Sequence, residues 1–410
     1  MAELTIHRGT HQIGGCCIEL TCGVTVPPHG DHYGLYKKVP EDVPMYIGPM
    51  AKEILKVLVS RLDYLSGEKG LPVLERMRTY RAGEELGAFQ NIWMLPFYVD
   101  HSAPDAYMFY IQAAGKKILF SGDFRDHGIV GERDWLWRTL EKFVPKGIDL
   151  LVTEGTMLSR KAEAASSPVQ TEEQMDQRAE EMFRRHKYNF VLVSSTNLDS
   201  IMEFYHHTPK GMHFVSDAYQ AEVILTAMHG MERKGNYPQY QPSDGHSTIW
   251  VKARHCPWSH LRRLGSSLKK PVEIAPISDD DKLKLKRAGF VMLVRKNTNP
   301  VRKTIFEEMR DEFYPLDGQI IYSMWDGYLK PEHADRALID FIGGAIEHLH
   351  TSGHAYVETI SRLIKTVRPK VIVPIHTERA NEFTAIPDFA PYRERVRVLQ
   401  DGEKLLLDEL

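Results

Sequence analysis

Cysteine is scarce in this sequence, and long hydrophobic runs are absent. Only four cysteines occur among 410 residues, and Cys16, Cys17 and Cys22 crowd into one short segment. This distribution offers no even disulfide framework, so disulfide stapling is not expected and a reducing compartment fits. No apolar run approaches the length of a membrane span, and the opening MAELTIHRGT lacks the basic and then apolar pattern of a signal peptide. We therefore expect a cytoplasmic protein without membrane association.

Bulk charge is also small, because the formal net charge is only −3. A net charge this small does not indicate a nucleic-acid partner, and any surface that binds one would be a local basic patch. The hydrophobic fraction of 42% and the charged fraction of 26% are ordinary for a globular protein with a core. The length allows two to three domains, or one large domain that carries an insertion.

Strand-like and helical patterns alternate along the first part of the chain. LTIHRGTHQIGGCCIEL (4–20) alternates around Gly14-Gly15, which predicts two strands joined by a turn. Residues 50–66 carry apolar side chains at helical spacing. Short strand-like runs follow at 92–99, 106–123 (with a Gly-Lys turn) and 148–156. This order predicts an α/β fold in layers.

The composition changes at SRKAEAASSPVQTEEQ (159–174), a small-residue and polar linker that leads into a charged helix. The following FVLVSSTNLDSIMEFYHH and MHFVSD indicate βαβ units, which imply a parallel sheet. We therefore predict a second α/β domain at 165–345. The first domain would comprise 1–164 and close with 346–410, where a helix, the strand KVIVPIHTE and a strand-like tail follow.

Four stretches place histidine or carboxylate directly after a strand-like run, where loops present functional groups from a rigid sheet. They are HGDH (29–32), YVDHSAPDA (98–106), ILFSGDFRDHG (118–128) and VIVPIHTE (371–378). The H-x-D-H of the first supplies nitrogen and carboxylate donors that suit Zn²⁺ or Mn²⁺. With His101, Asp123 and His376 the donors suffice for two ions, which together can activate a water and clamp a phosphodiester. Separate polar turns with no shared site are the alternative interpretation.

These residues resemble the metallo-β-lactamase superfamily and, within it, the β-CASP nucleases, closest to ribonuclease J-like proteins. The resemblance runs over almost the whole chain, through IHRGTHQIGGCCIEL, HGDHYGL, DHSAPDAYMFYI, LFSGDFRDHG, LVTEGT, SSTNLDSIMEF and LHTSGHAYVETISRLIKTVRPKVIVPIHTE. It implies an αββα metallo-β-lactamase sandwich with an inserted α/β β-CASP domain. It also implies a zinc-dependent ribonuclease that uses a metal-bound hydroxide as its nucleophile.

The resemblance assigns roles to individual residues. The implied metal ligands are His29, Asp31, His32, His101, Asp123 and His376, with Asp123 bridging two zinc ions and Asp31 also orienting the nucleophile. His354 would stabilise phosphate or protonate the leaving oxygen, and Glu154 would orient it. The phosphate itself would be held by His350, Thr351, Ser352 and Gly353. The alternative is a purely structural role for these residues, as the N-cap of the following helix.

The sequence departs from the family pattern H-x-H-x-D-H at its first position, where Pro27 stands in place of histidine. Proline has no donor side chain, and the segment between Gly15 and His29 is also shorter than is usual in the family. We therefore predict impaired binding of one zinc and a more secure second site. Missing strands would leave edges that a homodimer would cover.

The leading functional hypothesis is hydrolysis of RNA, with a single strand held in a groove. Candidate groove residues are Arg125, Arg160, Lys161, Arg254, Arg262 and Arg263, with Trp325 and Tyr328 for stacking. One alternative is an impaired or inactive descendant that serves as an RNA- or protein-binding module, as the loss at Pro27 suggests. A further alternative is hydrolysis of a small phosphodiester or ester.

Overall fold

The computed structural model describes residues 3–13, 17–20, 23–25, 36–38, 41, 44–66, 70–89, 92–128, 134–160, 167, 169–232, 249–252, 272–295, 305–330, 338, 340 and 342–410. The chain divides into two compact units, which are residues 1–168 with 353–410, and residues 169–352. Strands and helices alternate in both units, so the predicted α/β fold class is confirmed. Among the helices in the described part of the chain, none is both long and apolar enough to span a bilayer.

The first unit contains a mixed six-stranded sheet in the order β18-β10-β9-β8-β7-β6. Its strands are β6 (Leu86–Phe89), β7 (Ile92–Tyr98), β8 (Tyr107–Ala113), β9 (Lys116–Phe120), β10 (Leu150–Glu154) and β18 (Val371–Ile375). The predicted hairpin at 106–123 is the antiparallel pair β8 and β9. Its turn lies at Ala114 and Gly115, which both adopt positive φ, as two-residue hairpin turns require. β18, β10 and β9 are mutually parallel.

A second sheet packs against one face of this one. Its order is β19 (Lys404–Leu406), β1 (Glu3–Arg8), β2 (Cys17–Leu20) and β3 (Gly23–Thr25). Ile6 from this sheet shares a core with Phe109 and Val152 of the six-stranded sheet. Because alternate side chains of a strand point to opposite faces, the six-stranded sheet also has a second apolar face. The closing strand β19 joins the two ends of the sequence in one sheet.

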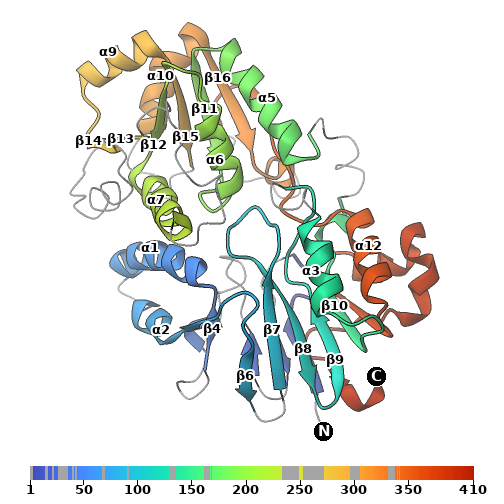
Figure 1. Cartoon of the computed structure of the whole chain (residues 1–410). Coiled ribbons are helices and arrows are strands. Elements are labelled where there is room, and N and C mark those ends of the chain that lie inside the picture. Colours follow the sequence, from blue (N-terminus) through green and yellow to red (C-terminus); the bar gives the residue numbers. More distant parts are fainter. Residues whose placement is uncertain are drawn as a thin grey trace. The chain divides into compact units, whose positions relative to one another are not determined.

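Helices α3 (Trp135–Phe143) and α12 (Val357–Val367) cover the other face of the six-stranded sheet (Figure 1). α12 buries Val357, Ile360 and Ile364 at helical spacing, which explains why its sequence predicts an amphipathic helix. The predicted helix at 50–66 is α1 (Pro49–Ser66), which packs with α2 (Gly70–Arg76) and β4 (Tyr46–Ile47). β4 in turn pairs with β5 (Arg78–Thr79). The result is the expected layering of helices and two sheets.

The second unit is built on a parallel seven-stranded sheet, in the order β14-β13-β12-β15-β11-β16-β17. Its strands are β11 (Tyr188–Val193), β12 (His213–Ser216), β13 (Ile249–Lys252), β14 (Val272–Ala275), β15 (Phe290–Val294), β16 (Gly318–Ser323) and β17 (Ile346–His348). The parallel pairing follows the βαβ pattern of the sequence. β17 pairs with β16, so residues 346–352 belong to this unit, whereas the sequence predicts its boundary after residue 345.

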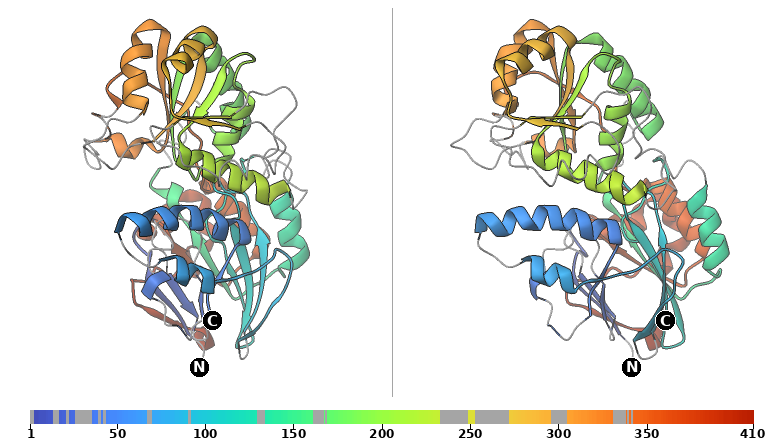
Figure 2. Two further views of the ribbon diagram at one scale, coloured as in Figure 1. Left: turned by 90° about the vertical axis from the view of Figure 1, so that its left-hand side faces the viewer. Right: turned by 60° about the vertical axis from the view of Figure 1, so that its left-hand side comes forward.

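Helices cover both faces of this parallel sheet (Figures 1 and 2). They are α5 (Glu172–Arg185), α6 (Leu198–His206), α7 (Ala218–Glu232), α9 (Asp279–Ala288) and α10 (Ile305–Asp317). On one face, Phe190 packs with Phe306 and Phe313 of α10. On the other, the side chain of Asn189 donates to the Phe183 carbonyl of α5.

Three ionisable side chains meet where α5 and α6 pack together. His207 Nε2 lies 2.5 Å from Asp176 Oδ1 and 3.8 Å from Glu203 Oε2. Burial, followed by the hydrogen bond and the charge of Asp176, raises the pKa of Glu203 to about 9. The hydrogen bond to Asp176 raises the pKa of His207 against the opposing effect of burial. Both groups therefore bind protons more tightly in the folded chain than in the unfolded one.

This cluster predicts that the second unit loses stability as pH rises. Glu203 contributes fully to the free energy of unfolding below 4.5, its pKa in the unfolded chain. That contribution is lost as pH rises toward 9, its pKa in the folded chain. Glu203→Gln keeps the shape without the titration. We expect its unfolding temperature to match the parent at pH 5, and its free energy of unfolding to exceed the parent's by on the order of 1 to 3 kcal/mol at pH 9. Calorimetry of the full chain from pH 5 to 9 measures this difference, with Glu181→Gln on the exposed face of α5 as control. Equal stabilities of Glu203→Gln and parent at pH 9 would contradict the prediction.

Candidate metal and proton-transfer site

Four strands of the six-stranded sheet end at the same edge of the first unit. β7 and β9 both run antiparallel to β8, and β10 and β18 run parallel to β9. The residues that finish or follow these strands are His101, Asp123, Glu154 and His376. The sequence therefore predicts correctly that His101, Asp123 and His376 follow strands, and the sheet topology brings them to one end of the sheet together with Glu154, the last residue of β10.

Asp123 is held at this edge by a turn that only glycine permits. Gly122 adopts φ 56°, and a Cβ there would lie 2.7 Å from the Tyr107 carbonyl oxygen. The turn directs the buried Asp123 toward His376, whose Nδ1 lies 3.5 Å from Asp123 Oδ1. The glycine of SGD thus serves the position of the carboxylate.

His376 adopts a left-handed backbone conformation, with φ 51°. Its N–H donates to the Gly9 carbonyl at 2.7 Å, which ties the end of β18 to the loop after β1. Its ring Nδ1 lies 2.8 Å from the Thr156 hydroxyl. A non-glycine residue in this region costs of order 1 kcal/mol, and such strain is common at functional positions.

Glu154 is wholly buried and binds three groups from two loops. The Phe124 N–H donates to its Oε1 at 2.9 Å and the Ala355 N–H at 3.4 Å. His354 Nδ1 lies 3.0 Å from Oε2. Burial alone lowers the pKa of His354, but the charge and hydrogen bond of Glu154 and the charge of Asp123 raise it above its ordinary value. His354 keeps 19% of its side chain exposed, so the ring reaches solvent while its partner does not.

Together these residues form one cluster of possible ligands. Asp123, Glu154, His354 and His376 each offer a ligand atom, and these atoms all lie within 4.8 Å of one another. Two carboxylates and two imidazoles are a donor set that suits Zn²⁺ or Mn²⁺. The residues present therefore fit a divalent metal ion.

His101 lies beside this cluster. Its ring centre is 5.3 Å from that of His354, and the two rings are nearly perpendicular. The Ala103 N–H donates to His101 Nδ1 at 3.0 Å. The other ring nitrogen, Nε2, takes no part in this hydrogen bond. A Cβ on Gly353 would lie 2.5 Å from Ser102 Oγ and 3.3 Å from His101 Nε2, so the glycine of TSGHA allows this close approach.

Several predicted site residues are placed elsewhere or lie outside the described residues. His29, Asp31 and His32 are outside them, as is Pro27. His350, Thr351 and Ser352 belong to the second unit, where the Thr351 hydroxyl donates to Glu172 Oε1 at 2.6 Å. Their role in phosphate binding stays a prediction.

The hypothesis that Arg125 lines a groove is wrong. Its side chain is fully buried and pairs with the buried Asp100 at 2.7 Å. The sequence could not show this, because Asp100 follows a different strand. Among the other groove candidates, Lys161, Arg254, Arg262 and Arg263 lie outside the described residues. In the second unit, Trp325 and the exposed Tyr328 pack edge to face at 5.3 Å.

Thr156 is a site residue that sequence reasoning missed. Its hydroxyl lies 2.8 Å from His376 Nδ1 and 3.3 Å from His354 Nδ1, so it contacts both rings of the cluster. The available signal was its place in TEGT, two residues after Glu154. A threonine after a strand is common, however, and its partners come from distant segments.

Comparison with known proteins gives a partial functional assignment. Residues 342–384 match a family model described as "Zn-dependent metallo-hydrolase RNA specificity domain". This segment contains His354, α12, β18 and His376. The match points broadly to the metallo-β-lactamase and β-CASP group, to a Zn-dependent hydrolase and to RNA specificity.

The whole fold has a counterpart among solved structures. A crystal structure of a protein of unknown function from Enterococcus faecalis V583 is similar with a TM-score of 0.67 and 17% sequence identity. The alignment covers 98% of this chain and 99% of that one. At this identity the likeness concerns the fold alone. No curated protein matches the chain.

Glu154 provides a test of this geometry. Glu154→Ala leaves the Phe124 and Ala355 N–H groups without their buried acceptor, and we expect a loss of about 2 to 5 kcal/mol in the free energy of unfolding. Glu154→Gln retains an acceptor, but its amide donates to His354 Nδ1 and forces the proton onto Nε2. We expect near-parent stability for this variant and a changed His354 tautomer, measured by ¹⁵N NMR of the imidazoles. The exposed Glu141→Gln should change neither quantity. An unchanged tautomer in Glu154→Gln would rule out this role for Glu154.

Proposed function

We propose that this chain is a metal-dependent hydrolase of RNA phosphodiester bonds, a ribonuclease of the β-CASP type. The observation that carries the proposal is the convergence of Asp123, Glu154, His354 and His376 within 4.8 Å, at the edge where the strands end. The family match over 342–384 supports RNA as the substrate. We further propose a single-stranded substrate and a ribonuclease J-like relationship, as the sequence motifs indicate.

The cluster divides into metal ligands and a proton-transfer pair. Glu154 already accepts hydrogen bonds on both oxygens, so we assign it to holding His354 and not to binding metal. Its hold on Nδ1 leaves His354 Nε2 to protonate the leaving oxygen or to stabilise phosphate. Asp123 and His376 are then the proposed metal ligands of the cluster.

The other proposed ligands come from the motifs of the sequence. They are His29, Asp31, His32 and His101, with Asp31 also orienting the nucleophile. A bound zinc or manganese ion supplies Lewis acidity, which activates water near neutral pH and polarises the phosphate. The Thr156 hydroxyl contacts Nδ1 of both His354 and His376, and these contacts orient the two rings.

The function is tested with single-stranded RNAs that carry a 5′-monophosphate or a 5′-triphosphate, in Zn²⁺ or Mn²⁺. We expect cleavage by the parent chain and a decrease of roughly 10²- to 10⁴-fold in kcat for His354→Ala, because the leaving oxygen loses its acid. Asp123→Asn and His376→Ala should abolish cleavage through loss of metal. His186→Ala removes a half-buried histidine of the second unit that pairs with Asp317, and it serves as the control.

An inactive parent in both metals would overturn the proposal and favour a binding module. Cleavage that persists in both Asp123→Asn and His376→Ala would place the activity elsewhere. DNA of the same sequence in the same assay tests whether the substrate is RNA. Product lengths distinguish release of single nucleotides from internal cleavage.

Pro27 predicts that one metal ion is held weakly. We expect fewer than two tightly bound zinc ions per parent chain, because the first histidine of H-x-H-x-D-H is absent. Pro27→His restores the donor and should raise the zinc content toward two ions per chain, as measured by elemental analysis after dialysis. Pro28→His offers the same side chain one position away and should not. Two tightly bound ions in the parent would show that Pro27 costs no metal.

A further inference from the structure

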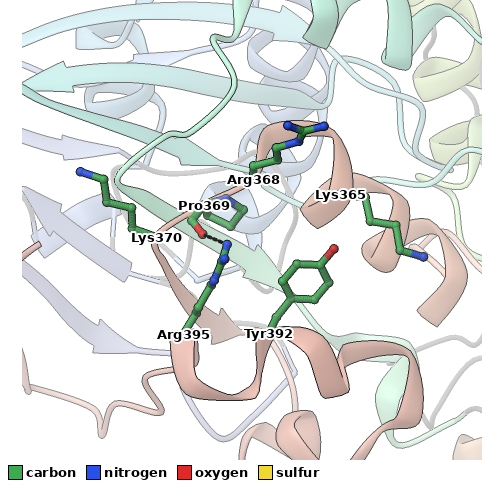
Figure 3. A pocket seen from close by; sticks show the side chains of 6 residues that line it. All are labelled: Lys365, Arg368, Pro369, Lys370, Tyr392 and Arg395. Carbon is green, nitrogen blue, oxygen red and sulfur yellow. Dashed lines mark hydrogen bonds between the residues drawn. The ribbon is translucent and has the colours of Figure 1, made fainter.

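A basic pocket lies at the amino end of β18, within the first unit. The cavity has a volume of 710 Å³, and its lining residues are Lys365, Arg368, Pro369, Lys370, Tyr392 and Arg395. The last turn of α12 and its C-cap supply Lys365 and Arg368, while Tyr392 and Arg395 come from the 3₁₀ segment η7 (Pro387–Arg395). In Figure 3, Tyr392 and Arg395 rise toward the end of α12, and Lys365 and Lys370 stand on opposite sides.

The positive charge of this pocket is poorly compensated. Lys370 pairs with Asp149 at 2.7 Å. Arg395 donates to the Pro369 carbonyl at 2.9 Å, a neutral acceptor that leaves its charge in place. Within the described part of the chain, no carboxylate forms an ion pair with Lys365, Arg368 or Arg395. Three cations with no acidic partner around one cavity favour a ligand that carries negative charge.

The backbone at Arg368 supports a role beyond the end of a helix. Arg368 adopts φ 51° and ψ 60°, the left-handed conformation in which helices usually place glycine. The negative end of the α12 dipole accounts for a cation at Lys365 and Arg368. It does not account for Arg395 or Tyr392, which η7 brings to the same cavity.

Two of the lining residues, Pro369 and Tyr392, offer flat surfaces that suit a planar ring. Pro369 is buried and Tyr392 is half-buried, and the Arg395 guanidinium lies 5.7 Å from the centre of the Tyr392 ring. An aromatic ring beside cationic side chains is the arrangement on which nucleobases stack while phosphates pair with the cations. A volume of 710 Å³ is in the range of small-molecule sites.

The pocket is separate from the proposed catalytic cluster. β18 begins beside Lys370 and ends before His376, and this strand separates the two by roughly 20 Å. A phosphate in the pocket is therefore not the one that lies at Asp123 and His354. Lys365, Arg368 and Lys370 also fall within the segment 342–384 that matches the RNA specificity model.

We propose that this pocket binds a nucleotide unit, with its phosphate at Arg368 and Arg395 and its base against Tyr392. The nucleotide is either part of an RNA strand that also reaches the catalytic cluster or a free mononucleotide. The first source rests on the proposed function, whereas the second does not. In both cases the recognised chemistry is a phosphate next to a base.

The test uses the full chain and a fluorescent 2′-O-methyl RNA of twenty nucleotides, which resists cleavage. The variant is Arg368→Gly with Arg395→Gln, in which glycine accepts the left-handed backbone and so keeps the fold. We expect roughly tenfold weaker binding in fluorescence anisotropy. We also expect a slope of log K against log salt that is smaller by about 0.7 for each lost phosphate contact. Arg393→Gln is the matched control, because it lies on the same segment outside the pocket and donates to the Thr384 carbonyl.

Competition by uridine and adenosine 5′-monophosphates separates the two sources. If a mononucleotide displaces the fluorescent RNA from the parent but not from the double variant, a free nucleotide is supported as ligand. Loss of affinity for the long RNA alone supports the strand. Equal affinity and equal salt slope in parent and double variant, for the RNA and for both mononucleotides, would overturn the proposal.

Cleavage of a dinucleotide, too short to reach from the cluster to the pocket, keeps this test apart from the proposed function. The double variant should cleave it at the parent's rate, because the pocket residues take no part in the chemistry. A parent that binds the long RNA through the pocket but cleaves neither the short RNA nor an unmodified RNA of the long sequence would contradict only the proposed function.

Discussion

The candidate site depends on one buried carboxylate. Glu154 has no contact with solvent, and a buried charge is tolerated only where donors surround it. Those donors are the Phe124 N–H, the Ala355 N–H and the His354 ring, which come from the loop after β9 and the loop before α12. The fold and the site are therefore stabilised by the same contacts. A change in either loop moves His354 and leaves a charge without its partners.

The two ends of the strands in the six-stranded sheet carry different kinds of side chain. At the carboxyl ends of β9, β10 and β18, acidic and imidazole side chains gather around Glu154 and suit a cation. At the amino end of β18, cations gather around Tyr392 and suit an anion. The single strand β18 separates these two regions. One short element thus sets the spacing between the two places where we propose that ligand binds.

The elements of the fold follow from local patterns, whereas the partners of individual side chains do not. Periodicity predicted α1, α12 and the β8–β9 hairpin, because burial of one face imposes a period on the sequence. It also placed Asp123 and His376 after strands. It could not predict that Arg125 pairs with Asp100, that Thr351 donates to Glu172, or that Thr156 lies between two histidines. These contacts join segments that are distant in sequence, so no local spacing encodes them.

The tie between His376 and Gly9 has a consequence for the making of the protein. The N–H of His376 donates to a carbonyl near the start of the sequence, and β19 completes the sheet that begins with β1. A chain emerging from the ribosome therefore holds β1 without its neighbour β19 until residues 404–406 have been synthesised. Contacts between such distant residues form slowly, since the long intervening loop must first be closed. The turn at His376 therefore reaches its place beside Gly9 only after residue 376 has been synthesised and this long loop has closed.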